Sequence, residues 1–294
     1  MRSQLRGIIP PMTTPFDREG RVDEPAFREE VRYLVSAGVH ALAVGGSTGE
    51  GHTLTAEELR RLTAAAAEES AGRLPVVAGI IADSTRAVIE KGNAVRDLGV
   101  AALQITPVHY LFTPNEAEMF RFYAAIGEAV RLPILIYNVV PWSYATPALL
   151  CKLISEVEHV IGVKQSAGDM HALAELLLRL EGRGLVFAAV DDLLYPCFAL
   201  GSHGSIAAIL TAVPKLCVDL WNAVQQADHA AALRLHERLL WVWKAIAGPN
   251  LPAGVKAAME LQGRRAGLPR EPMHPLSPQQ ATVVREALER ASVL

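Results

Sequence analysis

The sequence contains few cysteines, and their positions exclude two common kinds of site. Cys151, Cys197 and Cys217 are the three cysteines of the chain, and no two of them have the CxxC spacing. Such isolated positions provide neither a disulfide framework nor a thiolate metal site. We therefore expect reduced, buried thiols that take no part in the chemistry.

Excess charge of one sign and long apolar runs are also lacking. Lys and Arg number 28 against 31 Asp and Glu, which gives a formal net charge of -3 without a basic run. Because nucleic-acid binders concentrate Lys and Arg on one face, we expect no nucleic-acid partner.

Prolines interrupt residues 1–16, and neither a signal peptide nor a later membrane span is visible. We expect a cytoplasmic protein with no membrane partner.

The sequence shows no linker rich in Gly, Ser or charge, and no low-complexity tract that would separate two domains. A chain of 294 residues is long for one domain, yet barrels of alternating strands and helices commonly reach this length. Its 51% hydrophobic and 20% charged residues suit a folded globular body. We expect residues 1–294 to form a single domain.

Eight short runs rich in Val, Ile and Ala predict eight strands. Their nearly continuous apolar character, in place of alternation, is typical of parallel strands that are buried on both faces. The runs are residues 7–10, 41–44, 76–81, 101–106, 134–138, 161–164, 186–190 and 205–209.

Segments with helical periodicity lie between these runs, and several carry start signals. Thr55 with Glu58, and Thr113 with Glu116, have the spacing of a capping box. Pro114 would then occupy the first helical position, where its missing N–H costs nothing. The pattern predicts strands and helices in strict alternation.

This alternation predicts an α/β fold, a (β/α)8 TIM barrel, over residues 1–212. No GxGxxG turn follows the first strand to indicate a doubly wound open sheet. After the eighth strand the chain becomes helical, so residues 213–294 are predicted to form C-terminal helices packed on the barrel.

Lys164 is the strongest candidate for a catalytic residue. It lies within the apolar run 161–164, and barrels of this kind carry their active site at the C-terminal ends of the strands. Burial favours the neutral amine, which can attack a carbonyl and form an imine. The alternative is an ion pair inside the barrel with Asp191 or Asp192.

Ser47, Thr48 and Tyr137 could complete such a site. Ser47 and Thr48 lie in a glycine-rich turn whose N–H groups and hydroxyls could hold a carboxylate. The alternative is a simple strand-to-helix turn without a binding role, which has the same sequence pattern. Tyr137 ends the run 134–138, and its phenol could pass protons between the imine and the substrate. A core tyrosine with a satisfied hydroxyl is the alternative.

Four segments together resemble the dihydrodipicolinate synthase and N-acetylneuraminate lyase superfamily of class I pyruvate-type aldolases, over nearly the whole chain. They are GSTGE at 46–50, YNV at 137–139, GVKQSAGD at 162–169 and GSHGSI at 201–206. The resemblance implies that Lys164 forms the Schiff base and Tyr137 relays protons. It also implies that Ser47 and Thr48 hold the carboxylate of a 2-oxo acid, with Ile206 as a backbone contact near the same pocket.

The resemblance further implies the chemistry and the assembly. The imine acts as an electron sink, so that a bond beside the former carbonyl breaks or forms through an enamine. No cofactor beyond the lysine is implied, and relatives are commonly dimers or tetramers. We also expect no metal, because no His and carboxylate pair has ligand spacing, although His52 and His203 could line the mouth of the site.

Two positions depart from the synthase pattern. Trp142 stands where synthases carry an arginine associated with the carboxylate of the second substrate. An acidic aldehyde would lose this anchor, so an aromatic or less polar aldehyde becomes the expected partner. His109 takes the place of a tyrosine that reaches a neighbouring subunit's site, while Tyr110 could supply the phenol if the loop register shifts.

We therefore expect a Schiff-base lyase or aldolase that acts on pyruvate or another 2-oxo acid and is not the lysine-pathway synthase itself. One alternative is a dehydratase, deaminase or decarboxylase of a deoxy-2-oxo sugar acid on the same scaffold. Another is a non-catalytic 2-oxo acid binder, against which the intact Lys164, Tyr137 and Thr48 argue.

Overall fold

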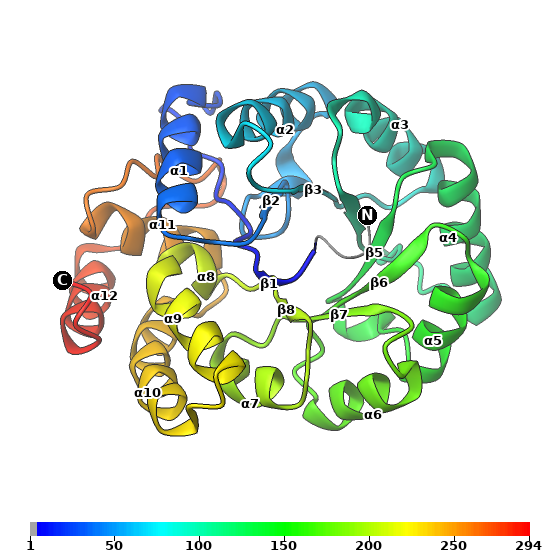
Figure 1. The fold of residues 1–294 in the computed structure, drawn as a ribbon. Coiled ribbons are helices and arrows are strands. Elements are labelled where there is room, and N and C mark those ends of the chain that lie inside the picture. The colour runs from blue at the N-terminus through cyan, green and yellow to red at the C-terminus, as the bar shows by residue number, and fades with distance from the viewer. Residues whose placement is uncertain (1–4) are drawn as a thin grey trace.

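Eight parallel strands form the centre of the molecule, and helices surround them (Figure 1). The structure is a computed structural model and describes residues 5–294. The strands are β1 (Gly7–Ile8), β2 (Leu42–Val44), β3 (Val76–Ile80), β4 (Ala102–Ile105), β5 (Ile134–Asn138), β6 (Val160–Gln165), β7 (Leu185–Ala188) and β8 (Gly204–Ser205). Their order in the sheet is β1-β8-β7-β6-β5-β4-β3-β2, which confirms the predicted TIM-barrel fold.

The ring closes between β1 and β2 through single backbone hydrogen bonds. The His40 N–H donates to the Ile8 carbonyl at 2.9 Å, and the Met12 N–H donates to the Ala43 carbonyl at 2.8 Å. A parallel bridge pairs Pro11 with Ala43 at the same seam. The first and last strands of the sheet are therefore joined, so the barrel leaves no free edge along this seam.

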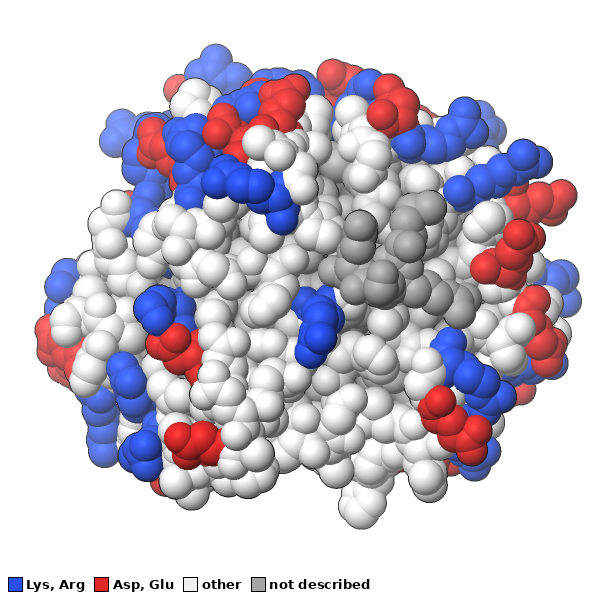
Figure 2. Space-filling view, viewed as in Figure 1, with Lys and Arg blue, Asp and Glu red and all other residues white. Residues whose placement is uncertain are grey.

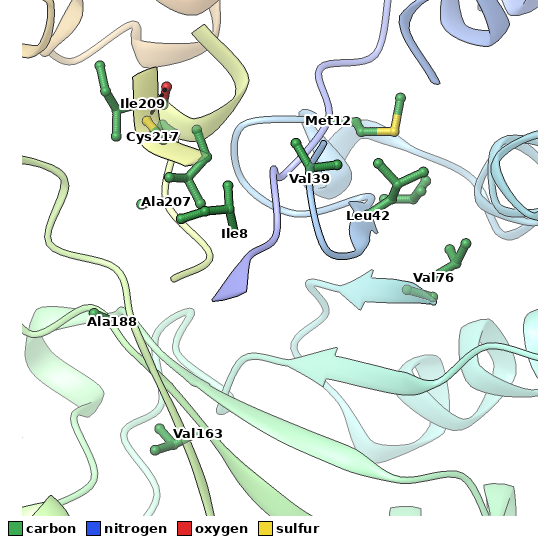
Figure 3. Packing of buried hydrophobic residues seen from close by; sticks show 14 of the residues in the cluster. Ile8, Met12, Val39, Leu42, Val76, Val163, Ala188, Ala207, Ile209 and Cys217 are labelled. Carbon is green, nitrogen blue, oxygen red and sulfur yellow. Dashed lines mark hydrogen bonds between the residues drawn. The ribbon is translucent and has the colours of Figure 1, made fainter. Parts of the chain in front are cut away.

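Side chains alternate between the inside of the barrel and the surrounding helices. A small cluster that includes Ile9, Ala43, Val77, Leu135 and Phe187 fills the interior. Their neighbours along the strands belong to a larger cluster under the helices, part of which Figure 3 shows around Leu42, Val76, Val163 and Ala188. Since successive residues of a strand point to opposite faces, the side chains two positions along from Leu135 also face the interior.

The helices of the barrel follow the strands in order. They are α1 (Glu24–Ser36), α2 (Ala56–Ser70), α3 (Thr85–Val95), α4 (Glu116–Val130), α5 (Pro147–Glu156), α6 (Met170–Leu180), α7 (Leu194–Ala199) and α8 (Ile209–Ala212). The predicted capping box at the start of α2 is confirmed, because Thr55 Oγ1 accepts the Glu58 N–H at 3.1 Å and Glu58 Oε2 accepts the Thr55 N–H at 3.0 Å.

The second predicted capping box is wrong by two residues. Helix α4 begins at Glu116, and Asn115 caps it by accepting the Glu118 N–H at 3.0 Å. Thr113 and Pro114 precede the cap. The overlapping pair Asn115 and Glu118 has the same spacing, and its amide side chain makes an effective cap.

The C-terminal extension consists of α9 (Pro214–Gln225), α10 (His229–Ile246), α11 (Leu251–Leu261) and α12 (Pro278–Arg290), which gather on one side of the ring next to α1 (Figure 1). Strand β8 ends at Ser205, earlier than the run 205–209 predicts, because the same apolar run continues into α8. A buried ion pair between Glu30 and Arg264 joins the extension to α1.

The described surface carries both signs of charge. On the face drawn in Figure 2, basic and acidic side chains alternate around the edge and form no patch of one sign. Within residues 5–294, no helix is both long enough and apolar enough to cross a membrane.

Candidate active site

The glycine-rich turn after β2 is held inside the barrel mouth by close backbone packing. Gly45 has a φ of +76°, and a Cβ on Gly79 of β3 would lie 2.8 Å from the backbone of Gly45 and Gly46. A Cβ on Gly51 would meet the Gly45 carbonyl oxygen at 1.8 Å. Only glycine fits these contacts, so the turn folds tightly over β3 and places Ser47 beside the interior.

Lys164 lies in the middle of the site, on β6. In the sheet it is in register with Tyr137 of β5 and Phe187 of β7, and Phe187 faces the interior. The lysine is 3% exposed, and its Nζ lies 3.7 Å from the centroid of the Tyr137 ring. No carboxylate of residues 5–294 forms an ion pair with it. Lys164 is therefore buried without the ion pair to Asp191 or Asp192 that was the alternative hypothesis.

Tyr137 connects Lys164 to the glycine-rich turn. Its hydroxyl lies 3.0 Å from Ser47 Oγ, and either hydroxyl can donate this hydrogen bond. The hydroxyl of the buried tyrosine thus pairs with Ser47, another candidate site residue. The fold brings these two residues together from distant parts of the sequence. The hydroxyls form a path along which a proton can move past the lysine.

Two amide side chains, which the sequence analysis did not single out, fix the ends of β5 and β6. Asn138 Nδ2 donates to Gln165 Oε1 at 2.9 Å and to the Ala145 carbonyl at 3.0 Å, while Asn138 Oδ1 accepts the Ala145 N–H at 2.8 Å. Asn138 and Gln165 directly follow Tyr137 and Lys164. Their network holds the two strand ends, and hence the phenol and the amine, in a defined relation.

Thr48 and Ile206 lie close to the interior but contribute differently. Thr48 is 5% exposed, next to Ser47 in the turn. The Ile206 side chain is fully buried in the interior cluster, and its N–H donates to the Ala188 carbonyl at 3.0 Å. Only the carbonyl of Ile206 therefore remains for the backbone contact that the resemblance implies.

Asp191 follows β7 and binds the start of α8. Its Oδ1 accepts the N–H of Ile209, the first residue of α8, at 2.8 Å. Burial raises the pKa of Asp191 to about 6, although the Ile209 N–H and the charge of Lys164 act in the opposite direction. The carboxyl can thus change its protonation state near neutral pH, close to the lysine.

Trp142, His109 and Tyr110 form a rim around the mouth instead of contacting the Tyr137 and Ser47 hydroxyls. The Trp142 indole N–H donates to the His109 carbonyl at 2.9 Å, and the ring is 63% exposed. Asp83 accepts the N–H groups of His109 and Tyr110 at 2.9 and 2.8 Å, and its Oδ1 lies 3.3 Å from His109 Nδ1. His109 Nδ1 also lies 3.0 Å from the Pro107 carbonyl oxygen, so the contacts of this ring nitrogen are with its own loop and with Asp83.

The sequence analysis did not predict several buried polar side chains of the barrel. Gln104 on β4, Thr106 directly after β4 and Ser166 after β6 have side-chain polar atoms without a hydrogen-bond partner among residues 5–294. A Cβ on Gly46 would lie 3.4 Å from Gln104 Nε2, so this amide sits directly against the glycine-rich turn. A polar residue inside the apolar run 101–106 is the signal that could have found Gln104.

The described residues provide no obvious metal centre. No group of three His, Cys, Asp or Glu side chains within residues 5–294 could hold an ion. The suggestion that His203 lines the mouth is wrong, because it precedes β8 at the opposite end of the barrel, where its Nδ1 accepts the Val186 N–H at 3.1 Å.

A parallel barrel with a buried, inward lysine beside a tyrosine and a serine has the architecture of a class I lyase, an enzyme that works through an imine of its own lysine. Comparison with known proteins defines the family. The chain belongs to the dihydrodipicolinate synthetase family, whose model matches residues 4–291.

Individual relatives extend over the whole chain. A curated protein of Methanopyrus kandleri named 4-hydroxy-tetrahydrodipicolinate synthase is 33% identical over 298 residues, covering 100% of this chain and 99% of that protein. One of the same name from Phenylobacterium zucineum is 34% identical, covering 99% and 98%. The solved structure of YagE, a prophage protein of this family from E. coli K12 in complex with pyruvate, matches with a TM-score of 0.93 and 27% identity over 99% of both chains.

The expectation that the chain is not the lysine-pathway synthase is wrong. Four curated relatives that are 32% to 34% identical to it over 99% to 100% of the chain carry the name of that synthase. The expectation depended on two positions of the rim, Trp142 and His109. A substitution at either position changes the rim and leaves the interior groups around Lys164 as they are.

Proposed function

We propose that the chain is a 4-hydroxy-tetrahydrodipicolinate synthase that works through an imine between Lys164 and pyruvate. The observation that carries this proposal is the Lys164 amine, buried in the barrel next to the Tyr137 and Ser47 hydroxyls. The names of the curated relatives and the pyruvate in the YagE structure support the reaction and the first substrate.

The chemistry needs no group beyond the side chains of the barrel. The Lys164 amine adds to the keto carbon of pyruvate, and loss of water leaves a protonated imine. Because the imine withdraws electrons, a proton leaves the neighbouring methyl carbon and an enamine forms. The enamine carbon then attacks the carbonyl carbon of an aldehyde, whose oxygen takes up a proton as the new carbon–carbon bond forms and the imine to Lys164 returns. An amine carried by the aldehyde then adds to the imine carbon and displaces the Lys164 amine, which closes the ring and frees the enzyme.

Each of the remaining site residues has a separate role in this proposal. Tyr137 and Ser47 pass protons to and from the intermediates through their shared hydrogen bond. Ser47 and Thr48, with the N–H groups of the glycine-rich turn, bind the carboxylate of pyruvate. The Ile206 carbonyl contacts the substrate from the side of β8.

The second substrate follows from the chemistry of the product. A dipicolinate carries two carboxylates and a ring nitrogen, whereas pyruvate supplies one carboxylate and no nitrogen. The aldehyde must therefore bring a carboxylate and an amine. Trp142 cannot neutralise that carboxylate, so another group must hold it, and Trp142 contributes an apolar wall at the rim.

The proposal is tested by turnover. Wild-type protein and Lys164→Ala are incubated with pyruvate and a carboxylate-bearing amino aldehyde, and consumption of both substrates is followed. We expect the wild type to consume them in equal amounts and Lys164→Ala to show no turnover above background. Equal turnover by the two proteins would overturn the imine mechanism, and no turnover by folded wild type would overturn the assigned reaction.

We also propose that the enzyme needs no cofactor or metal and works in the cytoplasm. All three cysteines are free thiols, which suits a reducing compartment. Addition of a chelator should leave the rate unchanged if the lysine alone carries the chemistry.

Finally, we propose that the chain forms a homo-oligomer through the rim. Tyr110, Leu111 and Phe112 are 76%, 97% and 50% exposed, and Trp142 adds to this apolar surface. Exposed apolar groups that lie together mark contact surfaces more often than isolated ones do. Sedimentation should show a dimer or tetramer for the wild type, and dissociation for Leu111→Asp. A wild-type monomer would contradict this assembly.

A further inference from the structure

Glu50, which closes the glycine-rich turn, is buried and backbone-strained. It has a φ of +56°, in the left-handed region that residues other than glycine rarely adopt. A residue keeps this unfavourable conformation only where the surrounding structure holds it there. Its N–H donates to the Ser47 carbonyl at 3.0 Å, so the position of Glu50 and that of Ser47 are linked directly.

Both oxygens of Glu50 are bound by the C-terminal extension. Oε1 accepts from Lys256 Nζ of α11 at 2.6 Å, and Oε2 accepts the backbone N–H of Arg270 at 2.8 Å. The side chains of Lys256 and Glu50 are 3% and 0% exposed. Lys256 also donates to the Leu268 carbonyl at 2.6 Å. The charge of Glu50 thus has its partner 206 residues further along the chain.

Hydrogen bonds within the turn connect Glu50 to the residues that we propose to bind the substrate. The N–H groups of Gly49 and Gly51 both donate to the Gly46 carbonyl at 3.0 Å, and Thr14 Oγ1 donates to the Gly49 carbonyl at 2.7 Å. These hydrogen bonds tie the end of the turn, at Gly49 to Gly51, back to its start at Gly46 and Ser47. A displacement of Glu50 therefore displaces Ser47 and Thr48.

We propose that Lys256 is a positioning residue for the reaction, and that through Glu50 it sets the place of the two hydroxyls that bind the substrate carboxylate. This inference rests on the proposed function, since it assigns the carboxylate to the turn. The C-terminal extension is then part of the active-site apparatus and not only a covering of the barrel.

Removal of the lysine leaves an uncompensated charge in a closed space. A buried carboxylate without its partner must take up a proton or draw in water, and either change is costly. Arg270 holds the other oxygen through its backbone, so Glu50 can relax only by moving the turn. The expected consequence is weaker binding of a carboxylate substrate, with Lys164 itself undisturbed.

A second buried ion pair provides a matched control. Arg264 and Glu30 are 5% and 4% exposed and also tie the C-terminal extension to the barrel, with Arg264 donating to the Thr211 and Ala212 carbonyls. In residues 5–294, no hydrogen bond or ion pair joins the side chains of this pair to residues 46–51. Arg264→Met should therefore reproduce the loss of stability that Lys256→Met causes without affecting the turn.

The test measures borohydride trapping of Lys164 as a function of ligand concentration, for pyruvate and for hydroxyacetone, a ketone without a carboxylate. In Lys256→Met we expect the pyruvate concentration for half-saturation to rise about tenfold or more, and that for hydroxyacetone to change less than about twofold. Arg264→Met should change neither. Lys256→Gln, which keeps an N–H donor, should show an intermediate rise and serves if Lys256→Met does not fold.

The outcomes separate this inference from the proposed function. If Lys256→Met and Lys256→Gln keep the half-saturation for pyruvate within twofold of wild type, the positioning role is overturned. An equal rise for pyruvate and hydroxyacetone would also overturn it, because the effect would then not concern the carboxylate. If wild type itself is not trapped by pyruvate, the proposed function fails instead.

Discussion

At the scale of single residues, the hydrogen bond between Tyr137 and Ser47 is the path that we propose for protons to reach the imine. The phenol ring packs against Lys164 Nζ at 3.7 Å, while its hydroxyl points to the turn. One side chain thus packs against the amine and exchanges protons with the substrate. Substitution can separate these two contributions, because phenylalanine keeps the ring and removes only the hydroxyl.

We predict that Tyr137→Phe lowers kcat about a hundredfold, since a positioned acid–base group contributes on that order. Lys164 should still be trapped as the pyruvate imine by borohydride, more slowly, because the ring that packs on it is retained. Steady-state rates and intact mass measure the two effects. A kcat within threefold of wild type would assign the proton transfer to another group.

Gln104 is a second residue whose environment allows a sharp prediction. Both amide atoms are buried and have no partner among residues 5–294, so an apolar side chain of similar size removes a desolvation cost. We predict that Gln104→Leu raises the free energy of unfolding by about 1 kcal/mol in urea titrations.

Gln165→Leu is the matched control for this prediction. Gln165 is buried too, but it accepts a hydrogen bond from Asn138 at 2.9 Å, so its replacement should destabilise the protein by about 1 kcal/mol or more. Destabilisation by both variants would mean that Gln104 is hydrogen-bonded in solution.

Asp191 makes stability depend on pH. Its pKa is raised from 3.8 to about 6 by burial, so the folded protein binds the proton more tightly than the unfolded chain does. The free energy of unfolding therefore falls as the pH rises from about 4 through 6, because the buried carboxyl loses its proton. Above this range the carboxyl is ionised in both states, and the free energy of unfolding falls no further on its account.

We predict that Asp191→Asn, which keeps the oxygen that accepts the Ile209 N–H, stabilises the protein at pH 8 by up to about 3 kcal/mol and has little effect at pH 4. Unfolding midpoints in urea at the two pH values measure the difference. Equal effects at both would show that the carboxyl does not titrate between them.

At the scale of elements, the start of α4 shows how local signals compete. Asn115 and not Thr113 caps the helix, and its side chain and that of Glu118 bond each other's N–H groups. We predict that Asn115→Ala lowers the free energy of unfolding by about 1 kcal/mol, whereas Thr113→Ala changes it by less than about half of that. Urea titration distinguishes them, and the reverse order would favour the cap predicted from the sequence.

Elements built from local patterns could be predicted from the sequence, and their ends less well. The apolar runs give all eight strands, but the run 205–209 crosses from β8 into α8 without a change of composition. Lys164 was recognised because a charge interrupts an apolar run. Gln104 interrupts another run in the same way, and only the structure shows that its amide reaches the glycine-rich turn.

At the scale of the whole molecule, the barrel brings groups together that no local pattern connects. Glu50 and Lys256 are 206 residues apart and meet because α11 lies against the glycine-rich turn after β2. The rim residues Trp142 and His109 show the limit of local patterns, because the exclusion of the synthase rested on these two positions and was wrong. Interior groups in register, such as Tyr137 and Lys164, are a better guide to chemistry.

We propose that Lys164 forms a covalent imine with pyruvate, and the rest of the mechanism depends on this step. The most direct measurement is the intact mass of the protein after incubation with pyruvate and sodium borohydride, followed by peptide mapping, with Lys164→Ala as the control. We predict one reduced pyruvate adduct on Lys164 of the wild type and none in the control. An adduct of equal yield in Lys164→Ala, or no adduct on folded wild-type protein, would contradict it.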